Sequence, residues 1–262
     1  LEDITLRALR ILREADYIAA EDTRHTLKLL NHYDISKPLI SYHEHNRMEK
    51  GPEIIGLVKQ GHKVALVSDA GMPGISDPGA DLVQLAYEAG VSVTIVPGPS
   101  AALSALVLSS LPTRRFVFEG FLPRDKKQRQ ERIKLFKSEQ RTLIIYEAPH
   151  RLKDLLKDML DILGQRRIAI VRELTKIYEE TRLMSLNEAV EYYKDRTPKG
   201  EFVLVLEGAK PDSAQKDFSN ISIENHLRQY ISAGLSKKEA VKQVARDRNI
   251  PKSQVYPYSI DL

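Results

Sequence analysis

Apolar residues recur along the first part of the chain in two alternating patterns. A repeat of three to four positions predicts amphipathic helices, and the first of them begins after a cap at Asp3 or Thr5. Short apolar runs between the helices predict buried strands. Helices are expected in residues 5–16, 23–33, 48–61, 78–90 and 100–110, and strands in residues 17–22, 63–69 and 91–97. Such alternation with short connections is typical of a mainly parallel sheet covered by helices.

The same alternation starts again after a Pro-Thr-Arg-Arg break. Strands are expected in residues 116–121, 142–148, 167–174 and 201–208, and helices in residues 124–137, 150–164 and 185–195. The sequence therefore predicts an α/β protein with two α/β domains, residues 1–112 and 113–209. Residues 210–220 are polar and contain Pro and Ser, which predicts a linker. Residues 221–262 predict a small helical domain that resembles a helix-turn-helix.

Composition narrows the chemistry that the chain can perform. Its 262 residues are 42% hydrophobic and 29% charged, which is enough to form a buried core. The absence of cysteine excludes disulfides, thiolate metal sites and thiol nucleophiles. No apolar run reaches eighteen residues, and the charged, amphipathic start is unlike a secretory signal. We therefore expect a cytoplasmic protein that does not insert into membranes.

The positive charge is concentrated in two segments. The formal net charge is +4, yet residues 124–137 and residues 226–252 each carry seven basic and two acidic side chains. The rest of the chain is therefore acidic. Two basic patches on an acidic body predict a polyanionic partner, and the alternative is that both segments are solvated helix faces.

Two loops rich in glycine and proline follow two of the expected strands. Residues 68–79, with the sequence SDAGMPGISDPG, contain three glycines and two prolines, and residues 96–101 read VPGPSA. Glycine lets a ligand approach the backbone closely, and proline fixes its direction. Loops after parallel strands lie at the same edge of the sheet, so we expect the two loops to form one ligand site. Neither loop has the spacing of a dinucleotide or P-loop motif.

These two loops resemble those of the tetrapyrrole methylase superfamily of S-adenosylmethionine-dependent methyltransferases. Other motifs resemble one branch of it, the ribosomal small-subunit RNA methyltransferases that modify a cytidine 2′-hydroxyl. The motifs are EDTR (21–24), SYHEHN (41–46), FEGFLPR (118–124), YEAPHR (146–151), RELTK (172–176) and KGEFVLV (199–205). The resemblance covers residues 1 to about 208 and the tail.

The resemblance implies two α/β domains with S-adenosylmethionine in a cleft between them, a homodimer, and 16S rRNA or the small ribosomal subunit as partner. By position, the residues implied to line the cofactor are Asp69, Ala70, Gly71, Ile75, Ser76, Ser100, Ala101, Tyr146, Glu147 and Ala148. Members of the family have a strand and a Pro-Ile-Gly-Asn turn before the first helix, and this sequence starts at the next residue. Without that segment, part of the substrate side of the cleft would be open.

Candidate catalytic residues follow the strands. Glu21, Asp22 and Arg24 belong to a polar run that ends a strand, where polar side chains are hard to bury, and the same run is also a good helix cap. Methyl transfer to a ribose hydroxyl needs alignment and removal of a proton, and no metal. Asp22, Glu147 and His45 are candidates for the base, and the sequence does not choose among them.

The remaining candidates are expected to contact RNA. In a strand, His43 and His45 would share one face, but a third metal ligand is missing, so RNA contact is favoured over a metal site. The residues expected to bind substrate are His43, His150, Arg151, Arg124, Lys126, Lys127, Arg129, Lys237 and Lys238.

Three functions compete at this point. The first is 2′-O-methylation of a cytidine in 16S rRNA, in the decoding region. The second is methylation of a tetrapyrrole precursor, and the third is nucleic-acid binding without catalysis, centred on residues 219–262. The basic segments favour the first function over the second, and the glycine-rich loops argue against the third.

Overall fold

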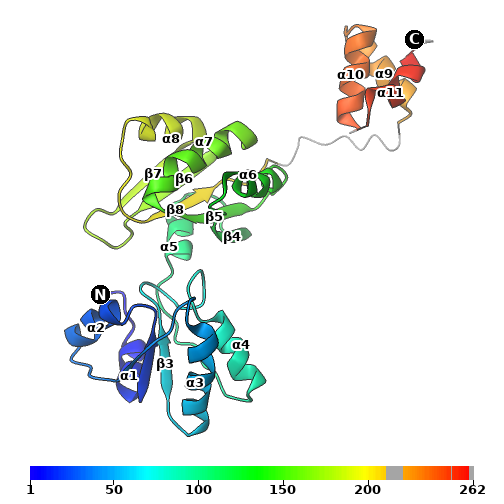
Figure 1. The fold of residues 1–262 in the computed structure, drawn as a ribbon. Coiled ribbons are helices and arrows are strands. Elements are labelled where there is room, and N and C mark those ends of the chain that lie inside the picture. The colour runs from blue at the N-terminus through cyan, green and yellow to red at the C-terminus, as the bar shows by residue number, and fades with distance from the viewer. Residues whose placement is uncertain (211–220, 249, 260–262) are drawn as a thin grey trace. The chain divides into compact units, whose positions relative to one another are not determined.

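The computed structural model describes residues 1–210, 221–248 and 250–259. The chain divides into two compact units, Leu1–Gly208 and Ala209–Leu262 (Figure 1). Each unit has its own hydrophobic cluster. The expected linker at residues 210–220 lies outside the described residues, apart from its first position. Among the described residues, no helix combines the length and apolar character that a membrane crossing needs.

The first unit begins with a three-stranded parallel sheet in the order β2-β1-β3. Its strands are β1 (Tyr17–Ala20), β2 (Leu39–Ser41) and β3 (Val64–Val67), and its helices are α1 (Leu6–Glu14), α2 (Thr23–His32), α3 (Arg47–Lys59) and α4 (Ala80–Glu88). Neighbouring strand residues point to opposite faces. Ile18 packs with α1 and α2, whereas Ala19 packs with α3 and α4. The sheet is therefore covered on both faces.

Local sequence signals place several of these elements. Thr5 caps α1, where its side chain accepts a hydrogen bond from the backbone N–H of Ala8 at 3.1 Å, so the predicted cap is confirmed. The strand predicted in residues 91–97 is wrong. These residues form no ladder with any described strand, and Ile95 is 66% exposed. An apolar run becomes a strand only when a neighbouring strand pairs with it, and here the described sheet ends at β3.

A five-stranded mixed sheet follows, in the order β4-β5-β8-β6-β7. Its strands are β4 (Phe116–Phe121), β5 (Thr142–Glu147), β6 (Arg167–Arg172), β7 (Glu180–Ser185) and β8 (Phe202–Leu206). The helices with this sheet are α5 (Ala101–Leu108), α6 (Lys126–Leu135), α7 (Leu152–Leu163) and α8 (Leu186–Lys194), and η1 (Pro149–Arg151) is a short 3-10 turn. The strands β4, β5 and β6 run parallel to one another, and β7 and β8 run in the opposite direction.

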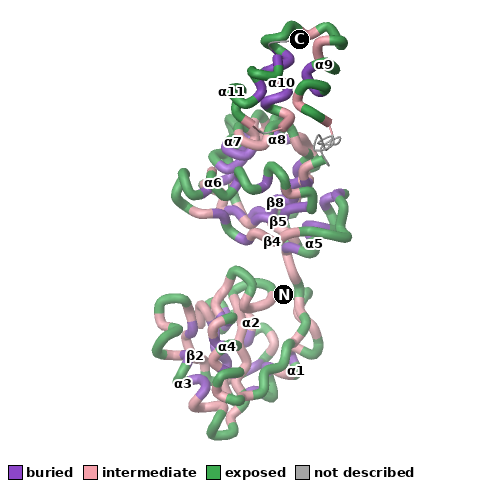
Figure 2. The backbone as a smooth tube through the Cα atoms, turned by 90° about the vertical axis from the view of Figure 1, so that its right-hand side faces the viewer, coloured by how far each residue is buried: buried purple, intermediate pink, exposed green. Residues whose placement is uncertain are grey.

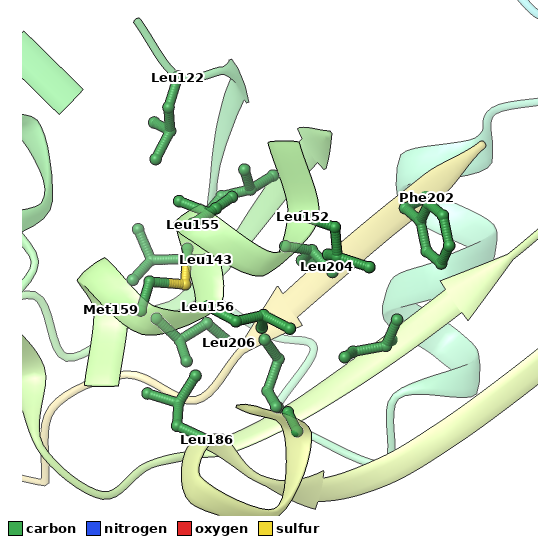
Figure 3. Packing of buried hydrophobic residues seen from close by; sticks show 14 of the residues in the cluster. Leu122, Leu143, Leu152, Leu155, Leu156, Met159, Leu186, Phe202, Leu204 and Leu206 are labelled. Carbon is green, nitrogen blue, oxygen red and sulfur yellow. The ribbon is translucent and has the colours of Figure 1, made fainter. Parts of the chain in front are cut away.

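The two faces of this sheet are covered by different helices. Leu143 and Ile145 of β5 join a cluster with α6, α7 and α8, which Figure 3 shows in part. Ile144 and Tyr146 face α5 instead. Figure 1 shows α5 on one side of the sheet and α7 and α8 on the other, and Figure 2 shows how deeply β5 and β8 are buried. The predicted α/β fold class is confirmed, although β2 and the edge strand β7 were not expected from the sequence.

The second unit is helical, as predicted. It contains α9 (Ile223–Ser232), α10 (Lys237–Asp247), α11 (Lys252–Val255) and the 3-10 turn η3 (Tyr256–Ser259). Ser236 and Glu239 form a capping box at the start of α10, and the turn between α9 and α10 uses Gly234 at a φ of +94°. Leu227 and Val244 are fully buried between these helices.

Candidate active site

Three chain segments emerge side by side where the strands of the first sheet end. Ala20, the last residue of β1, is in register with Ser41 of β2 and with Val67 of β3. Parallel strands carry their following loops at one edge, so the residues after each strand come together there. These residues include Glu21 and Asp22 after β1, His43 after β2, and Asp69 after β3.

Asp22 is engaged with its own helix. It is the N-cap of α2, and its Oδ1 accepts a hydrogen bond from the backbone N–H of Arg24 at 2.8 Å. The Nη2 of Arg24 donates to Asp22 Oδ2, also at 2.8 Å. The pKa of Asp22 is held well below its ordinary value, first by the Arg24 side chain and then by the Arg24 backbone. Such a carboxylate is a weak proton acceptor.

Two other carboxylates at this edge, Glu21 and Asp77, have raised pKa values. The backbone N–H of Asp22 donates to Asp69 Oδ1 at 3.3 Å, which ties the loop after β3 to the end of β1. Burial raises the pKa of Glu21, and the charge of Asp69 raises it further. Burial, Glu21 and Asp69 together raise the pKa of Asp77 to about 6. Asp77 was not predicted as a site residue, although it lies within the glycine-rich loop of residues 68–79.

The glycine-rich loop is shaped by positive backbone angles. Gly71 has a φ of +73°, and a Cβ placed there would lie 3.3 Å from the carbonyl oxygen of Pro99. A Cβ at Gly98 would meet Met72 at 3.4 Å. The loop after β3 and residues 97–101 therefore pack against each other with almost no spare room. The expectation that these two loops share one location agrees with this contact.

The same loop also reaches the second sheet. A Cβ at Gly120, in the irregular part of β4, would lie 3.0 Å from the Oγ of Ser76. The ring of Tyr146 packs edge-on against Phe118 at 5.1 Å between centroids. Burial raises the pKa of Tyr146, and the negative charge of Asp77 raises it further. Asp77 therefore lies within electrostatic reach of both the first sheet and Tyr146.

The start of α5, the helix that follows residues 97–100, is fixed by Ser100. Ser100 caps α5, and its Oγ accepts from the backbone N–H of Leu103 at 3.4 Å. Ala101 is the first residue of α5 and is half-buried. Of the other residues implied for the cofactor, Asp69, Ala70, Gly71, Ile75 and Ser76 are exposed on the loop.

Glu147 lies on the opposite face of its strand from Tyr146. Its side chain is fully buried, its Oε1 accepts from the backbone N–H of Ala148 at 2.9 Å, and its Oε2 has no hydrogen-bond partner. The Nε of Arg151 lies 3.3 Å from Oε1, and the Nη2 of Arg151 donates to the carbonyl oxygens of Leu122 and Pro123. Burial raises the pKa of Glu147. The Glu147–Arg151 pair therefore stabilises the turn before α6. Because the Glu147 carboxylate is buried beside Arg151, its position does not favour Glu147 as the base.

The two neighbouring histidines do not share a strand face. That expectation is wrong because β2 ends at Ser41, and the following residues form a turn in which the backbone N–H of His43 donates to Asn46 Oδ1 at 2.8 Å. The rings of His43 and His45 lie 6.0 Å apart. His43 lies close enough to lower the pKa of Glu21, whereas His45 is exposed. Within the described ranges, no group of three possible ligands is arranged to hold a metal.

The basic residues divide into exposed and buried ones. Arg124, Lys126 and Lys127 are exposed at the start of α6, as is His150 on η1, and Lys237 and Lys238 are exposed on α10. The prediction that Arg129 contacts RNA is corrected by its burial. Its side chain is 7% exposed, and its Nη2 lies 2.7 Å from the Oδ2 of Asp158, which is equally buried. Arg129 is thus occupied by an ion pair within the fold and is withdrawn from the predicted RNA surface.

Comparison with known proteins agrees with this architecture. Residues 1–190 match the tetrapyrrole (corrin/porphyrin) methylase family. Among solved structures, the chain is similar to uroporphyrin-III-C-methyltransferase from Thermus thermophilus, with a TM-score of 0.55, 21% identity and coverage of 78% of this chain and 88% of that one. It is also similar to the methyltransferase CobJ, with a TM-score of 0.60, 16% identity and coverage of 79% and 89%. These two likenesses concern the fold.

Sequence relatives are much more similar. The chain is 52% identical over 258 residues to ribosomal RNA small subunit methyltransferase I of Halalkalibacterium halodurans, covering 98% of this chain and 89% of that protein. It is 50% identical over 208 residues to the protein of the same name from Thermotoga maritima, covering 79% and 93%. The chain therefore belongs to the tetrapyrrole methylase family, within the branch whose members carry the name ribosomal RNA small subunit methyltransferase I.

Proposed function

We propose that this protein transfers a methyl group from S-adenosylmethionine to the 2′-hydroxyl of a cytidine in the decoding region of 16S rRNA. The main support is the environment of Asp77. This carboxylate lies on the glycine-rich loop, within electrostatic reach of Tyr146, and its pKa is raised to about 6. The names of the relatives support ribosomal RNA as the substrate. The exposed cations of α6 and α10 fit an RNA better than a small tetrapyrrole.

The loops fit the proposed cofactor. Gly71 lies so close to the Pro99 carbonyl that a side chain would displace one loop or the other, which leaves backbone groups at the surface for a ligand. Ser76, Ser100 and Tyr146 lie on the segments around this contact. S-Adenosylmethionine, when bound, supplies a methyl group already activated as a sulfonium.

The protein's own contribution is alignment and proton removal. We assign Asp77 as the acceptor of the ribose 2′-hydroxyl proton, which would move to one of its carboxylate oxygens, while S-adenosylmethionine would supply the methyl group and leave as S-adenosylhomocysteine. A base is most effective when its pKa lies near the working pH, and the pKa of Asp77 is closer to neutrality than that of Asp22. Burial raises the pKa of Asp77 most, and the negative charges of Glu21 and Asp69 raise it further. Positioning of the two reactants supplies most of the remaining rate.

The test is methyl transfer from labelled S-adenosylmethionine to 16S rRNA and to small subunits from cells lacking the activity, with the modified nucleoside identified by mass. Asp77→Asn is expected to lower kcat roughly 10²- to 10⁴-fold and to remove the rise of kcat/KM through pH 6. Asp161→Asn, an exposed position on α7, is the matched control. No transfer to the RNA, or transfer to a base atom, would disprove the proposal.

We also expect a homodimer, as the family resemblance implies. One side of α5 packs on the second sheet, while Leu103, Val107 and Leu108 on the same helix are exposed. An apolar helix face of this kind favours burial against another copy. Light scattering of the purified protein tests this, and a monomeric mass at micromolar concentration would contradict it.

A further inference from the structure

A cavity of about 120 Å³ opens beside the end of α8 in the second sheet. Arg172 from β6, Glu180 from β7 and Tyr192 from α8 line it, together with Arg196 and Lys199 from the segment that follows α8. This volume is enough for several waters or for an anion of the size of a phosphate group. The lining thus contains three cationic side chains and one carboxylate, that of Glu180.

The position of Arg196 is fixed by stacking. The guanidinium carbons of Arg182 and Arg196 lie 4.3 and 4.2 Å from the centroid of the Tyr192 ring. Glu180 forms an ion pair with Arg182, whereas Arg196 has no carboxylate partner within the described ranges. A stacked guanidinium loses little conformational freedom on binding an anion, and its planar donors match phosphate geometry.

Arg172 contacts two other residues that line the cavity. Its Nε donates to the carbonyl oxygen of Lys199 at 2.7 Å, and its Nη1 lies 4.0 Å from Glu180. The Lys199 side chain is exposed and forms no ion pair in the part of the chain that the structure describes. Two of the cations that line the cavity, Arg196 and Lys199, are therefore not neutralised by a carboxylate of the described residues.

The cavity lies at the same edge of the sheet as the starts of α6 and α7. Glu147, Phe202 and Arg172 are in register across β5, β8 and β6, so Arg172 is two strand spacings, about 10 Å, from Glu147. β4 and β5 end at this edge, and α6 and η1 begin there. The Nζ of Lys153, in the first turn of α7, donates to the carbonyl oxygen of Lys194 at 2.8 Å, which places the end of α8 at this edge too.

Basic side chains at the start of α6 and in the segment after α8 thus lie along one sheet edge. Arg124, Lys126 and Lys127 stand at the start of α6, and Arg196 and Lys199 stand beyond the end of α8. α6 packs on α7, and α7 packs on α8, so both groups lie on the same face of the sheet. The spacing suits a polyanion that runs along the edge rather than a single small anion.

We propose that this cavity is a phosphate subsite for the RNA substrate, in which Arg196 and Lys199 bind one backbone phosphate while the strand continues along the edge toward α6. The inference rests on the proposed function in taking RNA as the substrate. No covalent step takes place in the cavity, and its contribution is affinity and register.

The test compares Arg196→Gln/Lys199→Gln with the wild-type full-length protein. The control is Lys59→Gln/Lys63→Gln, which removes the same charge from exposed positions on the first sheet's other edge. The cavity variant is expected to raise KM for 16S rRNA roughly tenfold or more, with kcat and the Kd for S-adenosylmethionine unchanged. The slope of log K against log salt should fall by about 0.7 for the single-strand phosphate that is no longer neutralised. Arg196→Lys should recover part of the affinity.

RNA binding is measured in parallel by anisotropy without S-adenosylmethionine, so failure of methyl transfer does not prevent the test. Inorganic phosphate should displace RNA from the wild type more than chloride of equal ionic strength does, and the cavity variant should lose this difference. A cavity variant with the wild-type KM, Kd and salt slope would overturn the subsite. Absence of methyl transfer by a wild-type protein that binds RNA through the cavity would count against the proposed function alone.

Discussion

The carboxylate of Asp22 receives three hydrogen bonds from Arg24, one from its backbone N–H and two from its guanidinium, at 2.8 to 3.1 Å. These bonds stabilise the ionised form, and the pKa falls accordingly. The acid that the sequence marks most clearly at the end of β1 is therefore the one least suited to take a proton. Its neighbour Glu21 and the more distant Asp77 have raised pKa values instead.

Asp22→Asn should consequently leave kcat within about tenfold of the wild type. Asparagine is as good an N-cap as aspartate, so α2 should remain intact. The Arg24 side chain, already 88% exposed, would lose its partner and its fixed direction, so KM for RNA should rise. Single-turnover transfer and RNA binding, measured together, separate the two effects. A loss of 10²-fold or more in kcat at saturating RNA would restore Asp22 as the base.

The raised pKa of Asp77 also predicts how stability depends on pH. Its folded-state value of about 6 lies above the ordinary 3.8, so between these values the folded protein binds more protons than the unfolded one. The free energy of unfolding therefore decreases as the pH rises from about 4 to 6. Asp77→Asn removes this loss and should stabilise the protein above pH 6, by on the order of 1 kcal/mol after allowance for partial exposure.

Thermal unfolding at pH 5 and pH 8 checks this sign. The difference in Tm between Asp77→Asn and wild type should be larger at pH 8. Asp161→Asn, at an exposed site, should show no such difference. Equal gains at both pH values would mean that the Asp77 charge is not destabilised by its surroundings.

Gly71→Val should abolish S-adenosylmethionine binding. The residue has a φ of +73°, and its Cβ would meet the Pro99 carbonyl at 3.3 Å, so a branched side chain must push the two loops apart. Gly90→Val is the matched control, because Gly90 has a φ of +69° and nothing within 4 Å of a Cβ. Both variants carry the same backbone strain, and titration calorimetry should show lost affinity in the first alone. Unchanged affinity in Gly71→Val would remove the loop from the cofactor site.

The element pattern was predictable because apolar periodicity decides which residues are buried. The caps at Thr5 and Ser236 follow from local chemistry. The prediction of a strand in residues 91–97 was wrong because an apolar run becomes a strand only when another strand pairs with it, and pairing is a long-range property. Alternation within β5 would have placed Tyr146 and Glu147 on opposite faces, so that information was present in the sequence.

Two features of the site depend on different kinds of information. Arg129 lies four residues before the buried Ile133, a helical spacing that already indicates the inner face of α6. The environment of Asp77 was not predictable in the same way. The raised pKa of Asp77 depends on its burial and on the carboxylates of Glu21 and Asp69. Glu21 lies more than fifty residues before Asp77 in the sequence and Asp69 lies eight residues before it, and only folding brings the three carboxylates near one another.

The buried pair of Arg129 and Asp158 should contribute to stability and not to RNA affinity. Asp158→Ala leaves a buried guanidinium without its partner, which should cost about 3–5 kcal/mol of unfolding free energy. Arg129→Met/Asp158→Leu removes both charges and should recover most of that loss. Urea unfolding of the single and double variants measures the coupling. If the double variant folds normally but loses RNA affinity, Arg129 belongs to the RNA surface after all.

The second unit should act as an added RNA-binding element that the cofactor site does not need. The second unit is compact by itself, and every residue implied for the cofactor lies in the first unit, Leu1–Gly208. On α10, Lys238, Lys242 and Arg246 recur every four residues and are all exposed, opposite the buried Ala240 and Val244.

Truncation after Gly208 should therefore preserve S-adenosylmethionine affinity while weakening RNA binding and flattening its salt dependence. Lys238→Gln/Lys242→Gln/Arg246→Gln in the full chain should reproduce most of this effect, with a slope of log K against log salt lower by about 0.7 for each phosphate that is no longer neutralised. Lys59→Gln/Lys63→Gln serves as the charge control. The truncation and the triple variant must agree, because a truncation that weakens binding while the triple variant does not would assign the RNA-binding surface to another face of the unit. Wild-type affinity and slope in both would mean that the second unit has a different role, such as contact between protomers, and the basic stripe on α10 would then be only a solvated helix face.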